Sequence, residues 1–380
     1  MDKRTLKWST VFGIAMLYSS VVCVTAAAGE IEYPLLNTTQ DTLTPKAGRK
    51  IIQFSILAST STQSEDVHSD TMRSRARKRT EQPDYADVQY GPYERNKLDI
   101  WLAENESPTP LVVYFHGGGF FTGDKHTIRQ SLNKQNLLSS LLAAGISVAA
   151  VNYRLSTTAP YPAQMHDGAR ALQFLRYNAA RYNIDPARIG VSGTSAGGGI
   201  SLWLAFHEDL SDPVSKDPIN RLSTRVSAAV VYNTQTTYDP RKIMKLFNTK
   251  HVEWPLIKFF GMYTANDVND PKYHPLFIDA SSINHLTTDD VPVLLYYSQA
   301  EIPLEANTRG HKHIHHPRFG QLLKEKMDQL VIVCVLKLRE DYRNSSSNVI
   351  KDSVNFFIDA FNKNNHAFPD KPSIQLPSVH

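Results

Sequence analysis

The chain has 380 residues, of which 41% are hydrophobic and 21% are charged. This composition is typical of a globular protein, and the length suits one large α/β domain with extensions or two small domains. The formal net charge is only +4, and the basic run RSRARKR at 73–79 lies in a spacer rich in serine, threonine and glutamine. Because nucleic-acid binding requires basic residues clustered on a folded face, we expect no nucleic-acid partner.

The first 28 residues have the pattern of a secretory signal peptide. The positive stretch MDKRTLK precedes the apolar stretch WSTVFGIAMLYSSVV, and Ala26, Ala27 and Ala28 provide an A-x-A cleavage site. We therefore predict an exported protein, periplasmic or extracellular. The alternative is an uncleaved segment that anchors the chain in a membrane. Cleavage would leave Cys334 as the only cysteine, which excludes a disulfide within the mature chain and indicates a buried core residue.

Residues 29–84 are rich in polar and charged side chains, and we predict a spacer with little fixed structure. From residue 85 to 365, short β-branched and aromatic runs alternate with amphipathic stretches. The alternation predicts a mostly parallel sheet with helices on both faces, which is an α/β fold. The predicted strands are 98–103, 111–116, 146–153, 189–193, 226–233, 291–298 and 331–338, and the predicted helices are 166–182, 317–330 and 348–363. Residues 366–380 form a tail.

The segment 235–290 interrupts this alternation with several aromatic residues among short helical fragments. Two interpretations are open. The segment is either a lid or pocket wall over a site, or a packed peripheral subdomain.

The stretch GTSAGGG at 193–199 contains the pattern G-x-S-x-G, the nucleophile elbow of serine hydrolases. An apolar strand precedes it and a helical stretch follows, which is the context that the motif requires. Gly193 and Gly197 allow a sharp turn that leaves the Ser195 hydroxyl exposed. The backbone N–H of Ala196 then points toward a developing oxyanion.

A second motif, HGGGF at 116–120, follows the strand LVVYF. Consecutive glycines expose backbone donors, so the N–H groups of Gly117 and Gly118 are the expected partners of the Ala196 N–H in an oxyanion hole. His116 is expected to orient the loop rather than to act as a base.

The chain resembles α/β-hydrolase esterases of the HGGG-containing, hormone-sensitive-lipase-like branch, and within it the bifunctional feruloyl and acetyl-xylan esterase-like (BD-FAE) group. The resemblance covers about residues 85–365 and rests on the stretches YGPYERNKLDIWLA, VVYFHGGGFFTGDK, IDPARIGVSGTSAGG and VPVLLYYS, in that order. It implies the eight-stranded α/β-hydrolase fold, no metal or organic cofactor, and ester hydrolysis through an acyl-enzyme. It also implies structural roles for Asp167 and Asp185.

In this fold the catalytic acid follows the nucleophile in the chain, and the histidine comes last. The family pattern G-x-x-D after the strand VPVLLYYS corresponds to SQAE at 298–301, which places Glu301 at the acid position. The alternative is an exposed loop carboxylate without a catalytic role.

The histidine departs from the family pattern, because the loop 339–347 after the last strand contains none. One hypothesis is a relocated base at His315 or His316, in the run HKHIHH at 311–316. Another is His366, although the preceding helix would carry it away from the catalytic edge. A third is that no catalytic histidine exists. The histidine run alone does not indicate a metal site, since no cysteine or firmly placed acid accompanies it.

We therefore predict an exported serine hydrolase that acts on small or polysaccharide-linked carboxylic esters. Ser195 would attack, Glu301 would orient His315 or His316, and the oxyanion hole would hold the developing charge. The alternative is a degenerate hydrolase that binds a ligand or partner without turnover. The sequence indicates membrane contact only if the N-terminal segment stays uncleaved, and it does not indicate an oligomeric state.

Overall fold

The computed structural model describes residues 82–364, except 131, 306–307, 309–310 and 343–344. The predicted signal peptide, nearly all of the spacer, the C-terminal tail and His366 lie outside these residues. Internal contacts divide the chain into units 1–59 and 60–380, and everything described below belongs to the second unit.

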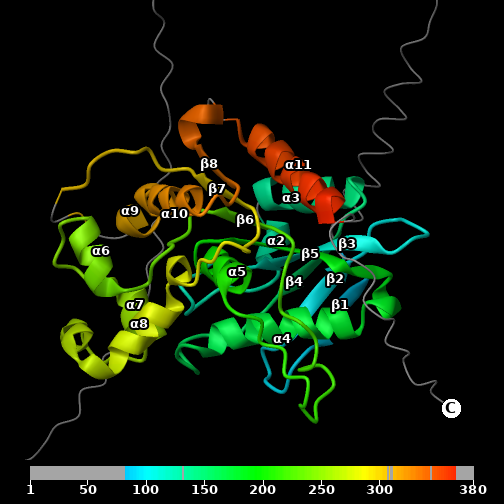
Figure 1. Cartoon of the computed structure of the whole chain (residues 1–380), viewed down its shortest axis with the longest axis horizontal. Coiled ribbons are helices and arrows are strands. Elements are labelled where there is room, and N and C mark those ends of the chain that lie inside the picture. Colours follow the sequence, from blue (N-terminus) through cyan, green and yellow to red (C-terminus); the bar gives the residue numbers. More distant parts are fainter. Residues whose placement is uncertain (1–81, 131, 306–307, 309–310, 343–344, 365–380) are drawn as a thin grey trace, which may run out of the picture. The chain divides into compact units, whose positions relative to one another are not determined.

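The centre of this unit is an eight-stranded sheet with the order β1-β2-β4-β3-β5-β6-β7-β8 (Figure 1). β2 pairs antiparallel with both β1 and β4, and the remaining pairs are parallel. This arrangement confirms the predicted mostly parallel sheet. The strands are β1 (Tyr85–Gln89), β2 (Lys97–Trp101), β3 (Thr109–Phe115), β4 (Ser147–Val151), β5 (Ile184–Thr194), β6 (Ala229–Tyr232), β7 (Val293–Tyr297) and β8 (Cys334–Leu338).

All seven strands expected from sequence are present, and β1 is an additional strand that the apolar pattern did not reveal. Its sequence YADVQ lies at the sheet edge and is half-buried or exposed along its length. An edge strand of this kind has no continuous apolar face, so periodicity gives no signal for it.

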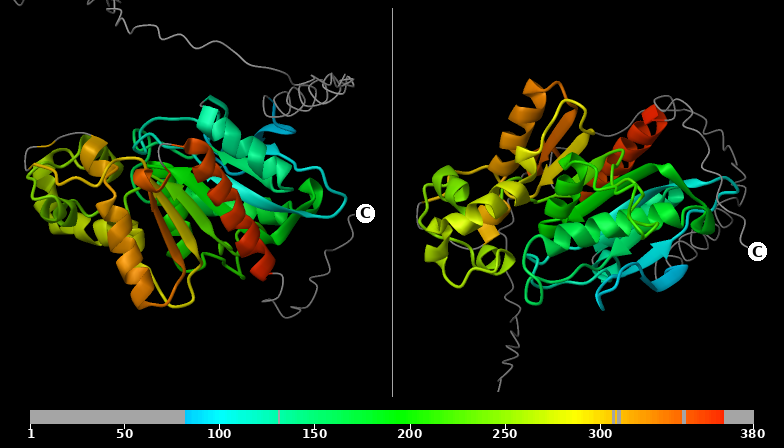
Figure 2. Two further views of the ribbon diagram at one scale, coloured as in Figure 1. Left: turned by 90° about the horizontal axis from the view of Figure 1, so that it is seen from above. Right: turned by 60° about the horizontal axis from the view of Figure 1, so that its bottom comes forward.

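Helices cover both faces of the sheet, as predicted. α4 (Ala163–Tyr177), α5 (Ala196–Phe206) and α10 (Arg318–Gln329) pack on one face, and α3 (Leu132–Ala143) and α11 (Ser346–Asn364) lie side by side on the other (Figures 1 and 2). α4, α10 and α11 are the helices expected from sequence.

Alternate residues of β3 enter the two cores that these helices enclose. Leu111, Val113 and Phe115 pack toward α4 and α5, whereas Val112 and Tyr114 pack toward α3 and α11. This period of two explains why the strand is apolar throughout.

The interrupting segment lies between β6 and β7 and contains six short helices, gathered at one end of the sheet (Figure 2). They are α6 (Pro240–Leu246), α7 (Trp254–Phe259), η2 (Ala265–Asn269), η3 (Pro271–Tyr273), α8 (His274–Ala280) and η4 (Ser282–Asn284). We call residues 240–284 the insertion. Its aromatic residues include both buried and exposed side chains: Phe259 and Phe277 are fully buried, and Tyr263 is exposed.

Cys334 opens β8 and is free and buried, as predicted. Burial raises the pKa of its thiol to about 12, so the group stays protonated and unreactive at neutral pH. Among the helices of the described residues, none has the combined length and apolarity that a bilayer-spanning helix requires.

Candidate active site

Ser195 occupies the sharp turn between β5 and α5, with φ 55° and ψ −120°. Such a backbone conformation is strained for a residue with a side chain, and it exposes the hydroxyl at the turn. The neighbouring glycines are required by space. A Cβ on Gly193 would lie 2.3 Å from the Gly197 carbonyl carbon, and one on Gly197 would lie 2.0 Å from the Phe115 oxygen.

Hydrogen bonds hold the turn in this conformation. The Ser195 N–H donates to the carbonyl of Tyr232, at the end of β6, over 2.8 Å. The Ser195 carbonyl accepts from the Gly199 N–H at 3.0 Å and from the Thr234 hydroxyl at 2.9 Å. The elbow is therefore fixed by β6 as well as by its own helix.

His315 lies beside this serine. Its Nε2 is 3.0 Å from the Ser195 Oγ, within ordinary hydrogen-bond range. The residue follows the short helix α9 (His311–Ile314), between β7 and α10, and both side chains are half-buried. An imidazole at this distance can accept the serine proton if its other nitrogen, Nδ1, carries the ring proton.

His316 is directed elsewhere. Its Nδ1 accepts from the Arg318 N–H at 3.1 Å, so Nε2 carries the proton and donates to the Ile302 carbonyl at 2.9 Å. The ring is buried and ties the loop 298–305 to the start of α10. Of the two histidines named from the sequence, the structure therefore brings only His315 to Ser195.

The loop after β8 lies at the usual site of the family's histidine. Its first part is the 3₁₀ turn η5 (Arg339–Tyr342), where the Tyr342 ring packs against Tyr296 at 5.7 Å and its hydroxyl donates to Asp352. A histidine arriving from a different loop takes up the contact with Ser195. The histidine-free loop 339–347 consequently does not leave the serine without an imidazole.

Glu301, the acid expected from the sequence, lies on the loop after β7 with its side chain exposed. No hydrogen bond or ion pair joins it to His315 in the described part of the chain. Glu301 immediately precedes Ile302, whose carbonyl accepts a hydrogen bond from His316, the residue after His315. The geometry thus brings the two segments together without joining the two side chains.

The glycine loop HGGG lies against the elbow. A Cβ on Gly117 would lie 2.9 Å from the Thr194 oxygen and 3.5 Å from the Ser195 Cβ. Among the described residues, none accepts a hydrogen bond from the N–H of Gly117, Gly118 or Ala196. These three backbone donors, of the glycine loop and of the residue after Ser195, are thus available to a ligand.

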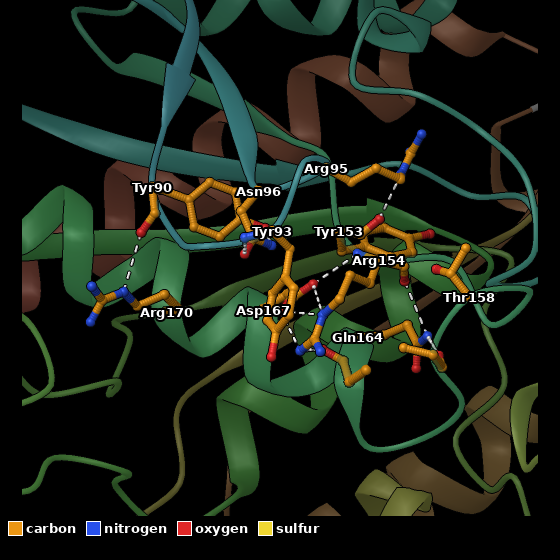
Figure 3. Close-up of polar contacts among 12 residues, drawn as sticks. Tyr90, Tyr93, Arg95, Asn96, Tyr153, Arg154, Thr158, Gln164, Asp167 and Arg170 are labelled. Carbon is orange, nitrogen blue, oxygen red and sulfur yellow. Dashed lines mark hydrogen bonds and ion pairs between the residues drawn. The ribbon is translucent and has the colours of Figure 1, made fainter.

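A hydrogen-bonded network contacts this loop, and Figure 3 shows its members Arg95 and Tyr153. The Tyr153 hydroxyl donates to the His116 carbonyl at 2.8 Å, and the two rings stack with centroids 4.3 Å apart. Arg95 donates to the Tyr153 carbonyl and to the Gly123 carbonyl, each at 2.9 Å. Burial raises the pKa of Tyr153 far above its ordinary value, so the hydroxyl remains a donor.

Asp167 belongs to a neighbouring part of the same network (Figure 3). Its carboxylate binds the Arg154 guanidinium at 2.7 Å and accepts the Arg154 N–H at 2.8 Å. Asp185 pairs with Arg188 at 2.6 Å near the start of β5. Both contacts are structural, in keeping with the roles that the family resemblance implies.

A small cavity of about 20 Å³ adjoins Ser195. It is lined by Gly119, Phe120, Ser195, Ala196, Gln235, Tyr238, Glu253, Pro255, Leu256 and Ile314. Pro255 and Leu256 belong to α7, and the Phe259 ring at the end of α7 stacks on Phe120 at 4.0 Å. The insertion therefore forms one wall of the cavity, which is the pocket-wall interpretation of this segment.

His313, in the histidine run 311–316, has surroundings separate from Ser195. His313 is buried, and its Nδ1 lies 3.5 Å from the Glu253 Oε1. Within the described residues, the histidine run is not part of any group of side chains close enough to share a metal ion.

The fold and this constellation define the class of the protein as an α/β-hydrolase. Residues 98–306, more than half of the chain, match the BD-FAE family. The chain belongs to the BD-FAE family.

Curated relatives agree with this assignment. The probable carboxylic ester hydrolase LipM of Mycobacterium tuberculosis is 30% identical over 224 residues, which are 57% of this chain and 48% of LipM. The AB hydrolase superfamily protein C1039.03 of Schizosaccharomyces pombe is 28% identical over 48% of this chain and 52% of its own length. The chain thus spans about half the length of these relatives.

Solved structures share the fold. A truncated carbohydrate esterase from gut microbiota superimposes with a TM-score of 0.57 at 21% identity, covering 73% of this chain and 96% of that chain. An acetyl ester-xyloside bifunctional hydrolase from Caldicellulosiruptor lactoaceticus gives 0.57 at 20% identity, covering 73% and 97%. At these identities the comparison establishes the fold.

Sequence reasoning did not identify the residues that shape and support the site. Arg95 lies in a stretch that carries the family resemblance and Tyr153 ends the predicted strand 146–153, but no local pattern assigns them to the glycine loop. Leu256 and Ile314 reach the cavity from separate segments. Only a weak signal, the aromatic richness of 235–290, pointed to a wall on that side.

Proposed function

We propose that this protein hydrolyses carboxylic esters through a covalent acyl-enzyme on Ser195. The observation that carries the proposal is the 3.0 Å contact between the Ser195 Oγ and the His315 Nε2, at a strained elbow packed against the glycine loop. The names of the curated relatives, which include carboxylic ester hydrolases, support the same chemistry.

In the proposed reaction, His315 accepts the Ser195 proton as Oγ attacks the ester carbonyl. The N–H groups of Gly117, Gly118 and Ala196 stabilise the negative oxygen of the tetrahedral intermediate. The imidazolium then donates its proton to the leaving alcohol, and the acyl group remains on Ser195. Water, deprotonated by the same imidazole, attacks this ester and releases the acid.

We propose Glu301 as the carboxylate that orients His315 during the reaction. Its support is positional, because His316 binds the carbonyl of the residue after Glu301. Catalytic hydrogen bonds are often long in a free enzyme and tighten when the substrate binds.

The proposed acyl group is short, with acetyl as the best fit. The cavity of about 20 Å³ has room for little more than one water-sized group. The alcohol side is proposed to be a small molecule or a polysaccharide. The names of the carbohydrate esterases that share the fold support the latter.

We further propose that the protein is exported, from the signal-peptide pattern of residues 1–28. The test is the mass of the chain recovered from cells that produce it. Cleavage near Ala28 is expected, whereas an intact chain in the membrane fraction would favour an anchor.

The decisive experiment measures p-nitrophenyl acetate hydrolysis by the full chain and by Ser195→Ala, His315→Ala and His316→Ala. The first two variants should lose a factor on the order of 10³–10⁴ or more in kcat. His274→Ala, at a half-buried histidine of α8, is the matched control and should retain activity. A wild-type protein no faster than Ser195→Ala would leave the ligand-binding, noncatalytic hydrolase as the better description.

A further inference from the structure

A second cluster of polar side chains lies at the far end of α5 from Ser195. His207 caps the C-terminus of α5, Asp279 lies in α8, and His285 caps η4. The Nε2 atoms of His207 and His285 are each 3.8 Å from the Asp279 Oδ1. One donor atom from each of the three residues lies within 4.8 Å of the others.

These donors have the chemistry of a zinc site. Two imidazoles and a carboxylate are ligands that Zn²⁺ accepts in tetrahedral sites, with a water in the fourth position. Metal–ligand distances of about 2 Å imply donor–donor separations of about 3.3 Å in a tetrahedron. The observed separations of 3.8 Å are close enough for side-chain rotations to close the difference.

Surrounding contacts orient two of the ligands. The His207 Nδ1–H donates to the Glu208 carbonyl at 3.0 Å, which directs Nε2 toward Asp279. The indole of Trp203 stacks on the same ring at 3.9 Å. The Tyr161 hydroxyl donates to the Asp279 Oδ2, leaving Oδ1 toward the histidines. Partners of this kind fix ring tautomers and carboxylate geometry in known metal sites.

His285 would change partner on metal binding. Its Nε2 now donates to the Asp279 carbonyl at 2.6 Å, and the ring proton would have to move to Nδ1 so that the Nε2 lone pair could turn to the metal. The carbonyl would keep the Trp203 indole N–H, at 2.9 Å, as a donor. The Asp279 carbonyl would therefore still accept a hydrogen bond after His285 has turned to the metal.

The cluster is accessible to an ion from solvent. The side chains of His207 and His285 are each 19% exposed, and that of Asp279 is 46% exposed. His285 also lines a surface hollow of about 370 Å³ together with Glu208, Asn284 and Thr287. An ion and its bound water can enter by this route.

We propose that His207, Asp279 and His285 bind a divalent cation of the zinc class. The ion would connect the end of α5 with α8 and η4, and so connect the hydrolase core with the insertion. Its role would be structural, because none of the three residues lines the cavity at Ser195. The proposal does not depend on ester hydrolysis.

The test uses the full chain after dialysis against a chelator. Calorimetric titration with Zn²⁺ should show one saturable site, and Co²⁺ should give the visible absorption of a low-symmetry nitrogen and oxygen site. Saturating Zn²⁺ should raise the melting temperature, because a ligand that binds only the folded state stabilises it. His207→Ala and His285→Ala should each lose about tenfold or more in Zn²⁺ affinity.

The His274→Ala variant is the matched control and should bind Zn²⁺ like wild type. Asp279→Asn, which keeps the shape of the side chain, guards against loss of folding and should also weaken binding. Each variant's melting temperature without metal establishes that it is folded. The absence of saturable binding, or affinity unchanged in the double variant His207→Ala/His285→Ala, would overturn the proposal. In the latter case the ion would bind at another place in the chain.

Discussion

The His315 Nε2 lies 3.0 Å from the Ser195 Oγ, although 120 residues separate the two in the chain. The serine stands at the end of β5 and the histidine on the connection that follows β7, with β6 between these strands. Carboxyl ends of parallel strands meet at one edge of a sheet, which brings these distant connections together. The histidine therefore reaches the serine from the connection that usually supplies the acid.

Glu301→Gln tests whether that connection also supplies the acid. If the carboxylate orients His315, kcat should fall by about 10²-fold or more with little change in KM, because an acid in this role acts mainly on the transition state. The measurement is the pH dependence of kcat for p-nitrophenyl acetate. Glu305→Gln, at an exposed carboxylate of the same loop, is the control and should behave as wild type. A decrease of less than about threefold would remove Glu301 from the mechanism.

Leu256→Ala tests the proposed limit on acyl length. Leu256 is buried and lines the cavity at Ser195, so removing its branched end should admit a longer chain. The ratio of kcat/KM for butyrate over acetate esters should rise about tenfold, the usual effect of one or two methylenes in a pocket. Leu256→Met, which preserves side-chain volume, is expected to leave the ratio near that of wild type. An unchanged ratio in Leu256→Ala would mean that the acyl group binds elsewhere.

Tyr153→Phe tests the support of the glycine loop. The variant loses the hydrogen bond to the His116 carbonyl, so the free energy of unfolding should fall by about 1–2 kcal/mol. A loosened loop should also lower kcat by about tenfold, less than the loss of one oxyanion donor. Urea unfolding and steady-state kinetics measure the two effects.

The matched control for this variant is Tyr114→Phe. Tyr114 is equally buried on β3, but its hydroxyl has no hydrogen-bond partner among the described residues. Removing that hydroxyl should therefore be neutral or slightly stabilising. Equal losses in both variants would show that the Tyr153 hydroxyl has no special role.

Asp290→Asn tests the pH dependence of stability. Burial raises the pKa of Asp290 to about 6 from its ordinary 3.8, so between these values the folded state binds more protons than the unfolded state. Stability from this group is accordingly highest below about pH 4 and falls as the pH rises to about 6. Asparagine removes the buried charge and can still accept from the Thr287 N–H.

The variant should be about 1–2 kcal/mol more stable than wild type at neutral pH and equal to it near pH 4. Urea unfolding at the two pH values measures this difference. The control is Asp289→Asn, where the carboxylate is exposed and the hydrogen bond from the Thr287 hydroxyl lowers the pKa. It should give no such gain. A stabilisation of Asp290→Asn that is independent of pH would contradict the explanation.

The fold was predictable because its signals are local. Seven strands contain short β-branched or aromatic runs, several of them apolar throughout, and α4, α10 and α11 show helical periodicity. β1 was not predicted because an edge strand needs no apolar face. The elbow was also predictable, since a tight turn requires glycine at fixed offsets from Ser195. The glycine loop was predictable as a run of three consecutive glycines after a strand.

The choice of the histidine was not predictable in this way. His315 and His316 are adjacent, have the same side chain and lie on the same connection between β7 and α10, so no periodicity distinguishes them. Their directions follow from the end of α9 and the start of α10, where His316 accepts the Arg318 N–H and binds the Ile302 carbonyl. With His316 held in this way, the ring of His315 faces Ser195.

The sequence by itself determined the sheet, the turn at Ser195 and the glycine loop 116–119, because each depends on residue types at short and fixed spacing. Only the tertiary structure decided which histidine meets Ser195, which insertion residues limit the cavity, and how His207, Asp279 and His285 converge. Those contacts join segments tens of residues apart or more. Their geometry is set by the packing of whole strands and helices, which no local pattern contains.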